Sequence, residues 1–524
     1  MSNWRRREQV FLKARSIDKS YAKRAGILTA VSLLAKVIGA LYRIPLTNVI
    51  GAEGVGLYQL VFSIYALSIA FTSAFTSTLI SRGVSSLNAM GENGKARGYF
   101  RKATAESVLS AALAAAILFA FGEAIASFQG APEGGLGYRV IAPAVVLVAI
   151  LSSLKGWFGG NLNLLPTALS IVIEQVVKLG AGISLALLFR GRGVATAAAA
   201  ALGGVTISEA AATLALALTY LKKRGGGAIE RVPLRSVLKE GLPLRLNGLI
   251  LPFAAFADGL LIVRLLMRYG LFRAQAISYY GIYSGAMGSI VNFPVVLVLS
   301  LAIAVIPLLS RAKATRDMLS LKEKSSLTVK LTIAVSLPFA LALTVLAPQI
   351  VTILYPVFTD EQAAVASALL SIGGGIVLFL SLTQIYASLL QAVDKADVAA
   401  ESLAIAMLAR VLLLLALVPR IGAIGIALST LISYAIATLL NVLKWVAYTG
   451  RAKNALKTLA SLTASGAIMI LAILAPVLLL KSAILSLAVS AAVGSIVYFA
   501  SVALFKVFSI GELRSMGLRK GAER

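Results

Sequence analysis

The 524-residue sequence contains neither cysteine nor histidine. The absence of cysteine excludes disulfide bonds and thiolate chemistry, and the absence of histidine excludes imidazole catalysis. Together the two absences remove most zinc and haem sites, whose protein ligands are usually cysteine or histidine. We therefore expect no cofactor and no bound metal. The lack of cysteine says nothing about the redox compartment.

Charged residues are also scarce, at 13% of the chain, whereas 59% of the residues are hydrophobic. A soluble protein of this size needs more charge to cover its surface, so the composition is typical of a polytopic membrane protein. The formal net charge is +28, which in a soluble protein would suggest nucleic-acid binding. Here the basic residues fall in the gaps between apolar runs, which indicates membrane topology and no nucleic-acid partner.

Fourteen apolar segments are long enough to cross a membrane as helices of about 20 residues. They are residues 26–50, 55–81, 103–129, 138–160, 166–189, 194–221, 242–268, 276–310, 326–355, 362–391, 397–418, 422–448, 456–480 and 482–506. When the N-terminus is placed in the cytosol, the inner gaps are basic and the outer gaps are short and nearly neutral. The sequence thus predicts an all-α protein with both termini in the cytosol.

A weak internal repeat relates two halves of the chain at an offset of roughly 230 residues. The stretch "TLISRG" at 78–83 is similar to "PLLSRA" at 307–312, and Lys178 in the fifth span aligns with Arg410 in the eleventh. Two six-helix, pseudo-symmetric halves are therefore predicted, followed by two extra C-terminal helices. Transporters built from parallel repeats bind their substrate between the halves and alternate access by rocking them.

This repeat predicts four parts of the chain. They are a basic cytosolic tail, an N-terminal half with the cytosolic loop that follows it, a C-terminal half, and helices 13 and 14 with a basic cytosolic tail, at residues 1–25, 26–240, 241–450 and 451–524.

Two cations interrupt the first predicted span, although a charge at the centre of a membrane helix costs about 2.5–3.5 kcal/mol on insertion scales. Lys36 and Arg43 are seven residues apart and share one helix face. In one interpretation both line a water-filled cationic cavity. In the other, Lys36 pairs with an acid on another helix and Arg43 extends to the outer interface.

Further charges lie in later spans. Glu174 and Lys178 are four residues apart and are predicted to pair along one helix face. Asp258 and Arg264 in the seventh span face different neighbours, and Asp258 is a candidate partner for the first-span cations. Lys155 is interpreted as extending to the inner interface.

Two buried charges have no partner that the sequence identifies, Glu209 in the sixth span and Arg410 in the eleventh. Cations dominate the first span while the acids are scattered, and this distribution favours an anionic cargo.

Three stretches are distinctive, namely "AKVIGALYRIPLTNVIGAEGVGLYQLVFSIY" at 35–65, "KGWFGGNLNLLPTALSIVIEQVVKL" at 155–179 and "YYGIYSGAMGSIVNFPVVLVLSLAIAVIPLLSRA" at 279–312. All three resemble flippases of the MurJ and stage V sporulation protein B type. This family is the polysaccharide branch of the multidrug, oligosaccharidyl-lipid and polysaccharide exporter superfamily. The resemblance implies a non-enzymatic flippase of the bacterial cytoplasmic membrane. Its cargo would be a polyprenyl-pyrophosphate-linked cell-wall precursor, lipid II or a related oligosaccharide, with membrane lipids and the cell-wall synthesis machinery as partners.

The resemblance also implies a role for Lys36 and Arg43, and the pattern of charged and polar residues adds further candidates. In the family, first-span cations face a central cavity and contact the pyrophosphate. The residues expected to bind substrate are Lys36, Arg43 and Arg264. The residues expected to gate or pair are Glu53, Asp258, Glu174 and Lys178, and the polar cavity residues are Tyr58, Gln59 and Asn292.

This chain departs from the family pattern at two points. Lys36 stands where arginine is more usual, which keeps the charge but loses the bidentate fork. Related flippases often carry an arginine in the eighth span, where this chain has Ala286 and Met287. The cavity is therefore expected to be less cationic than in those relatives.

Three other functions compete with the flippase. A cation-coupled multidrug exporter would use acids such as Glu53, Glu209 or Asp258. A membrane enzyme would need catalytic acids on a large outer loop, and the predicted outer loops are short. A non-transporting scaffold is disfavoured by the charges within the spans.

Overall fold

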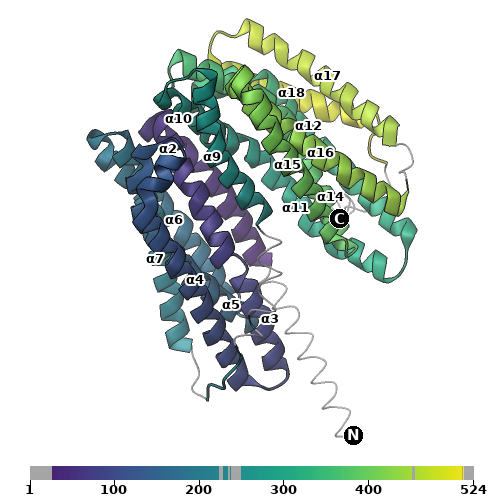
Figure 1. Cartoon of the computed structure of the whole chain (residues 1–524). Coiled ribbons are helices and arrows are strands. Elements are labelled where there is room, and N and C mark those ends of the chain that lie inside the picture. Colours follow the sequence, from purple (N-terminus) through teal and green to yellow (C-terminus); the bar gives the residue numbers. More distant parts are fainter. Residues whose placement is uncertain are drawn as a thin grey trace. The chain divides into compact units, whose positions relative to one another are not determined.

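The computed structural model describes residues 26–223, 228–233, 237, 249–450, 455–509 and 512. Every regular element within these residues is helical (Figure 1), which confirms the predicted all-α class. The predicted tail at 1–25 lies outside the described residues. The cytosolic placement of the two termini stays a prediction.

The chain divides into two compact units, Met1–Leu260 and Leu261–Arg524. The predicted boundaries of the four parts stay predictions. In the first unit, helical residues 26–41 precede α2 (Arg43–Thr72), α3 (Thr76–Ala89), α4 (Asn93–Phe128), η1 (Pro132–Gly134), α5 (Gly135–Gly160), α6 (Leu165–Phe189), η2 (Arg190–Arg192) and α7 (Val194–Lys223).

Helix α9 (Ile250–Tyr269) contains the boundary between the two units. The remaining helices belong to the second unit. They are α10 (Arg273–Gly281), the π-helix η3 (Ile282–Met287), α11 (Gly288–Ala314), α12 (Met318–Val345), α13 (Ala347–Leu354), α14 (Asp360–Ala392), α15 (Ala396–Ile421), α16 (Ala423–Thr449), α17 (Ala455–Leu479) and α18 (Ala483–Leu504).

Within the described residues, thirteen helical segments are long and apolar enough to cross a membrane. The first, residues 26–89, has 64 residues. As one straight helix it would be about 96 Å long, roughly three times the hydrocarbon thickness. Gly51 interrupts it with φ 73° and ψ 176°, a conformation open to a residue without a Cβ. The predicted spans 26–50 and 55–81 both fall in this segment, which accounts for thirteen segments instead of fourteen.

Helix α5 packs against α2, α3, α4 and α7 in the first unit. An aromatic cluster joins these helices near the end of α5. The ring of Phe100 on α4 lies 4.9 Å from that of Trp157 on α5 and 5.5 Å from that of Tyr220 on α7. Such aromatic pairs add about 0.5–1.5 kcal/mol each beyond the burial of their area. The cluster therefore fixes α4, α5 and α7 relative to one another.

The second unit repeats this order of packing. Helices α11, α12, α14, α15 and α16 contact one another as α3, α4, α5, α6 and α7 do. Ile80 and Leu309 occupy the same place in the predicted repeat, and both side chains are fully buried. Each is followed two residues later by an exposed arginine. The packing thus supports two halves of the same architecture.

The last two helices form a pair that docks on the second unit. Helices α17 and α18 contact each other, and both contact α12. Leu462, Ile473 and Tyr498 are fully buried in the core that they share with α12 and α13. The pair is therefore an addition to the second half, as the sequence predicted.

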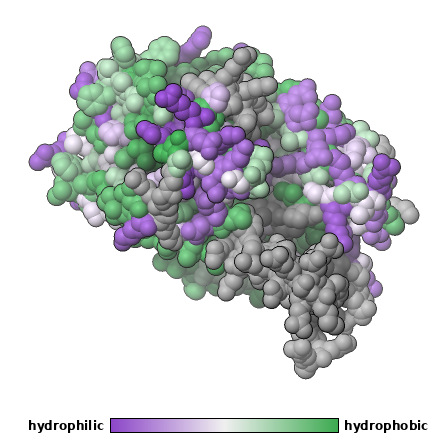
Figure 2. All heavy atoms as spheres, turned by 90° about the horizontal axis from the view of Figure 1, so that it is seen from below, coloured by the Kyte–Doolittle hydropathy of each residue, from purple (hydrophilic) through white to green (hydrophobic). Residues whose placement is uncertain are grey.

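Large apolar side chains are exposed on the outside of the spanning helices. On α4, Leu109, Leu113, Phe119 and Phe121 are 57–74% exposed. A surface of this kind is unfavourable in water and suits contact with lipid. In the view of Figure 2, hydrophilic residues are interspersed with hydrophobic ones. The chain is a multi-pass membrane protein.

Candidate functional site

Aromatic side chains line one face of α2 beyond the kink at Gly51. Tyr58, Phe62 and Tyr65 follow the i, i+4, i+7 spacing of one helix face. Ring centroids lie 5.8 Å apart for Tyr58 and Phe62, and 5.5 Å apart for Phe62 and Tyr65. Tyr58, Tyr65 and the predicted polar residue Gln59 are buried. This face forms an enclosed aromatic wall.

Lys178 of α6 lies against this aromatic wall. Its Nζ is 5.6 Å from the ring centroid of Phe62 and 5.8 Å from that of Tyr42, within the range of cation–π attraction. Arg43, half-buried at the start of α2, is an electrostatic neighbour of both Lys178 and Tyr58. Two cations from different predicted spans therefore come together in the first unit. The contacts of Lys178 with Tyr42 and Phe62 were not predicted, although the helical spacing of Tyr58, Phe62 and Tyr65 was visible in the sequence.

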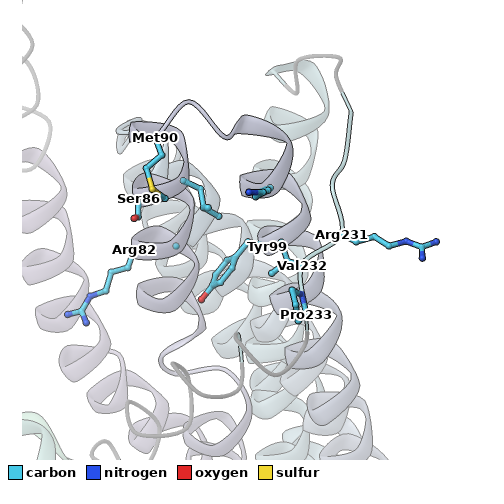
Figure 3. Close-up of a pocket in the computed structure, with 10 residues that line it drawn as sticks. Arg82, Ser86, Met90, Tyr99, Arg231, Val232 and Pro233 are labelled. Carbon is cyan, nitrogen blue, oxygen red and sulfur yellow. The ribbon is translucent and has the colours of Figure 1, made fainter.

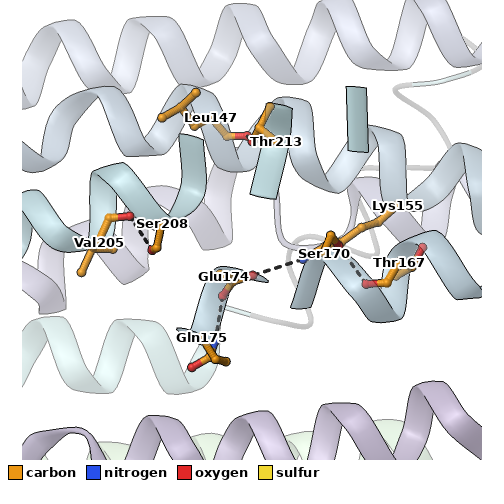
Figure 4. Close-up of polar contacts among 9 residues, drawn as sticks. All are labelled: Leu147, Lys155, Thr167, Ser170, Glu174, Gln175, Val205, Ser208 and Thr213. Carbon is orange, nitrogen blue, oxygen red and sulfur yellow. Dashed lines mark hydrogen bonds and ion pairs between the residues drawn. The ribbon is translucent and has the colours of Figure 1, made fainter. Parts of the chain in front are cut away.

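Glu174, one turn before Lys178 on α6, pairs with a different helix. Its Oε2 lies 3.4 Å from Nζ of Lys155 on α5, and its Oε1 accepts a 3.1 Å hydrogen bond from Nε2 of Gln175 (Figure 4). The ion pair of Glu174 is thus with Lys155 and not with Lys178, because Lys178 turns toward the aromatic rings. Lys155 was expected to extend to the interface, but its side chain is only 19% exposed.

Glu209 on α7 completes this group. Its side chain is 8% exposed, and its Oε2 is buried without a hydrogen-bond partner. Its electrostatic neighbours are Glu174, Lys155 and Lys178. The hydroxyl of the adjacent Ser208 donates 2.7 Å to a carbonyl of its own helix (Figure 4). Glu209 therefore carries a buried carboxyl oxygen that no hydrogen-bond donor stabilises when the group is ionised.

Two glycines bring α6 and α7 together at the level of these charges. A Cβ on Gly204 would lie 2.3 Å from Cα of Gly182, so no side chain fits between the two backbones. Lys178 lies four residues from Gly182, and Glu209 lies five residues from Gly204. Because consecutive helices joined by a short turn run antiparallel, these two charged residues lie at the same level.

The structure places the other predicted residues of the first unit differently. Lys36 is exposed on the helix over 26–41. One turn later, a Cβ on Gly39 would lie 3.5 Å from Oε1 of Gln175, so this turn faces α6. Glu53 is half-buried just beyond the kink, and its electrostatic neighbour is Glu133 of η1. Glu53 therefore lies apart from the cationic group.

Three further predicted residues lie on α9 and α11. Asp258 is half-buried and Arg264 is exposed, both on α9. Asn292 is exposed on α11, where its Nδ2 donates 2.6 Å to the carbonyl of Gly288. The predicted roles of these residues in gating and substrate binding stay predictions.

The second unit contains its own buried cation, Arg410 on α15, which is 6% exposed. Its Nη2 donates 2.6 Å to the hydroxyl of Tyr283, and its Nε and Nη2 lie 3.3 and 3.2 Å from Oγ1 of Thr430 on α16. Tyr283 belongs to the π-helix η3, which also carries Ala286 and Met287. The turn that lacks the arginine of related flippases is thus in contact with an arginine from another helix.

A separate cavity of about 580 Å³ lies where α3 and α4 meet the segment 228–233. Tyr99 lines it together with Arg82, Lys95 and Arg231. In Figure 3 the side chains of Arg82 and Arg231 point away from Tyr99 in opposite directions, and Lys95 pairs with Glu92 at 2.8 Å. The basic residues therefore do not converge on one point in this cavity.

The charges of the first unit decide what its polar group can bind. Arg43, Lys155 and Lys178 supply three positive charges, and Glu174 and Glu209 supply at most two negative ones. The net charge of the group is therefore positive whether the two carboxyl groups are ionised or protonated. Excess positive charge among spanning helices favours an anionic ligand.

The described spanning helices form two packing repeats with a buried cation in each, which defines a polytopic membrane protein built from two similar halves. A family model described as "Polysaccharide biosynthesis protein" matches residues 21–313, more than half of the chain, and the chain belongs to this family. A second family model, MatE, matches residues 269–415.

Two relatives from Bacillus subtilis (strain 168) cover different shares of the chain. Stage V sporulation protein B is 26% identical over 309 residues, which are 56% of this chain and 58% of that protein. Lipid II flippase MurJ is 23% identical over 418 residues, which are 74% of this chain and 75% of that protein. The match thus spans less than two thirds of the stage V protein.

A solved structure of lipid II flippase MurJ in an inward closed conformation has the same fold. It superposes with a TM-score of 0.69 and 15% identity, and covers 91% of this chain and 98% of that one. The resemblance expected from the motifs in 35–65, 155–179 and 279–312 is confirmed.

Proposed function

We propose that this protein is a flippase of the bacterial cytoplasmic membrane. Its cargo is a polyprenyl-pyrophosphate-linked cell-wall precursor, lipid II or a related lipid-linked oligosaccharide, which it moves by alternating access. The observation that carries the proposal is that two like charges, Arg43 and Lys178, are electrostatic neighbours at an aromatic wall. The chain belongs to the polysaccharide biosynthesis family and has a lipid II flippase as a relative.

The chemistry of the cargo matches this group. A pyrophosphate is a compact dianion or trianion, and arginine and lysine are its usual protein partners. Arg43 and Lys178 would attract it, with Lys36 at the entrance one turn before Gly39. A membrane potential of 100 mV contributes about 2.3 kcal/mol per charge moved, which favours outward movement of an anion. The proposed function is non-enzymatic, with membrane lipids and the cell-wall synthesis machinery as partners.

The experiment is a rescue of a bacterium whose own lipid II flippase can be switched off. Growth and externally exposed lipid II are measured with the wild-type chain, Arg43→Met and Arg139→Met. Arg139 is the matched control, because its ion pair with Glu123 is largely exposed. We expect the wild type and Arg139→Met to restore both readouts and Arg43→Met to restore neither while it inserts normally. A wild-type chain that inserts but leaves lipid II inside contradicts lipid II as cargo.

A second candidate is a cation-coupled multidrug exporter. The MatE match over 269–415 favours it, and so does the buried carboxyl of Glu209. This candidate predicts efflux of a fluorescent organic cation along a proton or sodium gradient, lost in Glu209→Gln. If the chain restores lipid II exposure but exports no dye, the flippase is supported and the exporter is refuted.

A further inference from the structure

Glu209 stands out among the ionisable groups of the first unit because one of its oxygens is buried without a hydrogen bond. An ionised carboxylate in this position loses its hydration and gains no donor at that oxygen, which is costly in an apolar interior. A protonated carboxyl places its neutral hydroxyl there at much lower cost. The site therefore favours a bound proton.

The charged groups around Glu209 come from each helix that faces it. Glu174 and Lys178 lie on α6 and Lys155 on α5, and Tyr65 on α2 is an electrostatic neighbour as well. Two cations and one carboxylate thus surround the carboxyl. The two cations favour the ionised form of Glu209, and the carboxylate of Glu174 favours the protonated form. Both protonation states of Glu209 therefore stay accessible, as is required of a group that takes up and releases protons.

The other elements that contact α7 are η1 and η2. Their charged residues are Glu133, Arg190 and Arg192. The helix η2 directly precedes Val194, the first residue of α7, which lies about 22 Å along the axis from Glu209. Arg190 and Arg192 are therefore too distant to govern the carboxyl, and Glu133 is an electrostatic neighbour of Glu53 instead.

The same residues form a polar route from one end of the unit toward its middle. By helix rise, Lys155 lies about 8 Å from the end of α5, and Glu174 and Lys178 lie about 14 and 20 Å from the start of α6. The connection 161–164 joins these two helix ends. By these distances the ion pair of Lys155 and Glu174 lies between that connection and Glu209.

We propose that Glu209 is a proton-binding site and that its protonation strengthens the binding of an anionic headgroup at Arg43 and Lys178. With both acids ionised, the five charged residues carry a net charge of +1. With Glu209 protonated they carry +2. Because binding linkage is reciprocal, the anion also promotes proton uptake. This inference rests on the proposed function for the identity of the anion, but not for the titration of Glu209.

The size of the effect follows from Coulomb's law. One unit charge acting over about 10 Å at an effective dielectric constant of about 20 changes a binding constant on the order of tenfold. Affinity for an anion is thus expected to fall about tenfold as pH rises through the titration of Glu209. Glu209→Gln mimics the protonated state, so its affinity should not show this tenfold fall.

The first measurement is an infrared pH titration of the purified full-length protein in lipid nanodiscs. The wild type and the control Glu123→Gln should show a protonated carboxyl band that disappears as pH rises, and Glu209→Gln should lack it. Glu123 is the matched control because its side chain is 71% exposed. A titrating band that persists in Glu209→Gln overturns the proposal.

The second measurement is the binding of farnesyl pyrophosphate as a function of pH. The proposal expects the affinity of the wild type to fall about tenfold relative to that of Glu209→Gln as pH rises, because only the titration of the probe's own phosphate remains in the variant. If Glu209→Gln does not fold, Glu209→Asp replaces it and should shift the pH of the transition. Equal pH dependence in wild type and variant, or no binding at any pH, overturns the coupling.

The two proposals fail in different ways. A chain that restores lipid II exposure but binds the probe with the same pH dependence as Glu209→Gln refutes the proton site and leaves the flippase intact. A chain with the expected titration and pH-linked binding that does not restore lipid II exposure supports the proton site and refutes lipid II as cargo.

Discussion

Substitution of Gly204 by alanine is expected to separate α6 from α7. The added Cβ would lie 2.3 Å from Cα of Gly182, whereas ordinary contacts begin at 3.4 Å. The helices must therefore move apart by about 1 Å, since the obstacle is backbone and cannot rotate away. Membrane helices associate through such close packing, because lipid gives them little hydrophobic drive to do so.

The magnitude follows from two opposing contributions. Overpacking of a well-packed interface costs about 1–3 kcal/mol, and contact with backbone places this case at the upper end. Alanine in place of glycine within a helix returns at most about 1 kcal/mol. We therefore expect Gly204→Ala to lose about 2 kcal/mol of stability. It should also weaken binding of farnesyl pyrophosphate, because Lys178 and Glu209 sit one turn from this crossing.

The assay is unfolding of the purified protein in detergent micelles, with Gly180→Ala as the matched control. Gly180 lies on the same helix as Gly182, and a Cβ there meets nothing within 4 Å. The control should be as stable as the wild type or slightly more stable. If Gly204→Ala is no less stable than Gly180→Ala, the reasoning from the glycine crossing is refuted.

Two further predictions concern the second unit. Tyr283→Phe removes the hydroxyl that accepts a 2.6 Å hydrogen bond from Arg410. Because a hydrogen bond to a charged group contributes about 1.5–3 kcal/mol, we expect the free energy of unfolding in detergent to fall by that amount. An unchanged free energy of unfolding would contradict this prediction. Burial alone raises the pKa of Glu512, but hydrogen bonds from Lys330 and Ser509 outweigh it and lower the pKa below its ordinary value of 4.5. Its stabilisation is therefore present at neutral pH and lost as pH falls below 4.5 through the lowered pKa. Wild type and Glu512→Gln should accordingly differ in unfolding at pH 7 and converge in acid, and a difference that grows in acid would refute this sign.

The two halves treat their buried cations in different ways. In the first unit, Lys178 lies over aromatic rings with carboxylates nearby. In the second unit, Arg410 is held by the hydroxyls of Tyr283 and Thr430. A hydroxyl donates and accepts without changing charge, whereas a carboxylate titrates. Under the proposal for Glu209, the buried cation site of the first unit is the one whose charge responds to pH, because its neighbours include a carboxyl that can bind a proton.

Much of the fold could be predicted because the bilayer imposes one strong rule. Backbone groups in lipid must bond within their own helix, so each run of about 20 apolar residues forms a span. The repeat between "TLISRG" and "PLLSRA" was also readable, since equivalent positions carry equivalent burial. The merging of the first two spans into one helical segment could not be predicted, because the backbone conformation of a single glycine does not change the hydropathy profile.

The candidate site could be predicted only in part. Arg43, Glu174 and Lys178 were recognisable as charges that have to be compensated inside a membrane. The groups that compensate these charges could not be predicted, because partners on different helices depend on how those helices cross.

The sequence by itself determined the class, the spans, the repeat and the list of charges within the spans, because each depends on composition and local spacing. The tertiary structure decided that Glu174 pairs with Lys155, that Lys178 lies on aromatic rings and that Glu209 keeps an unbonded oxygen. Those outcomes depend on the crossing of α5, α6 and α7, where contacts at Gly182 and Gly204 fix the level at which the helices meet. A pattern along one helix contains no information about that level.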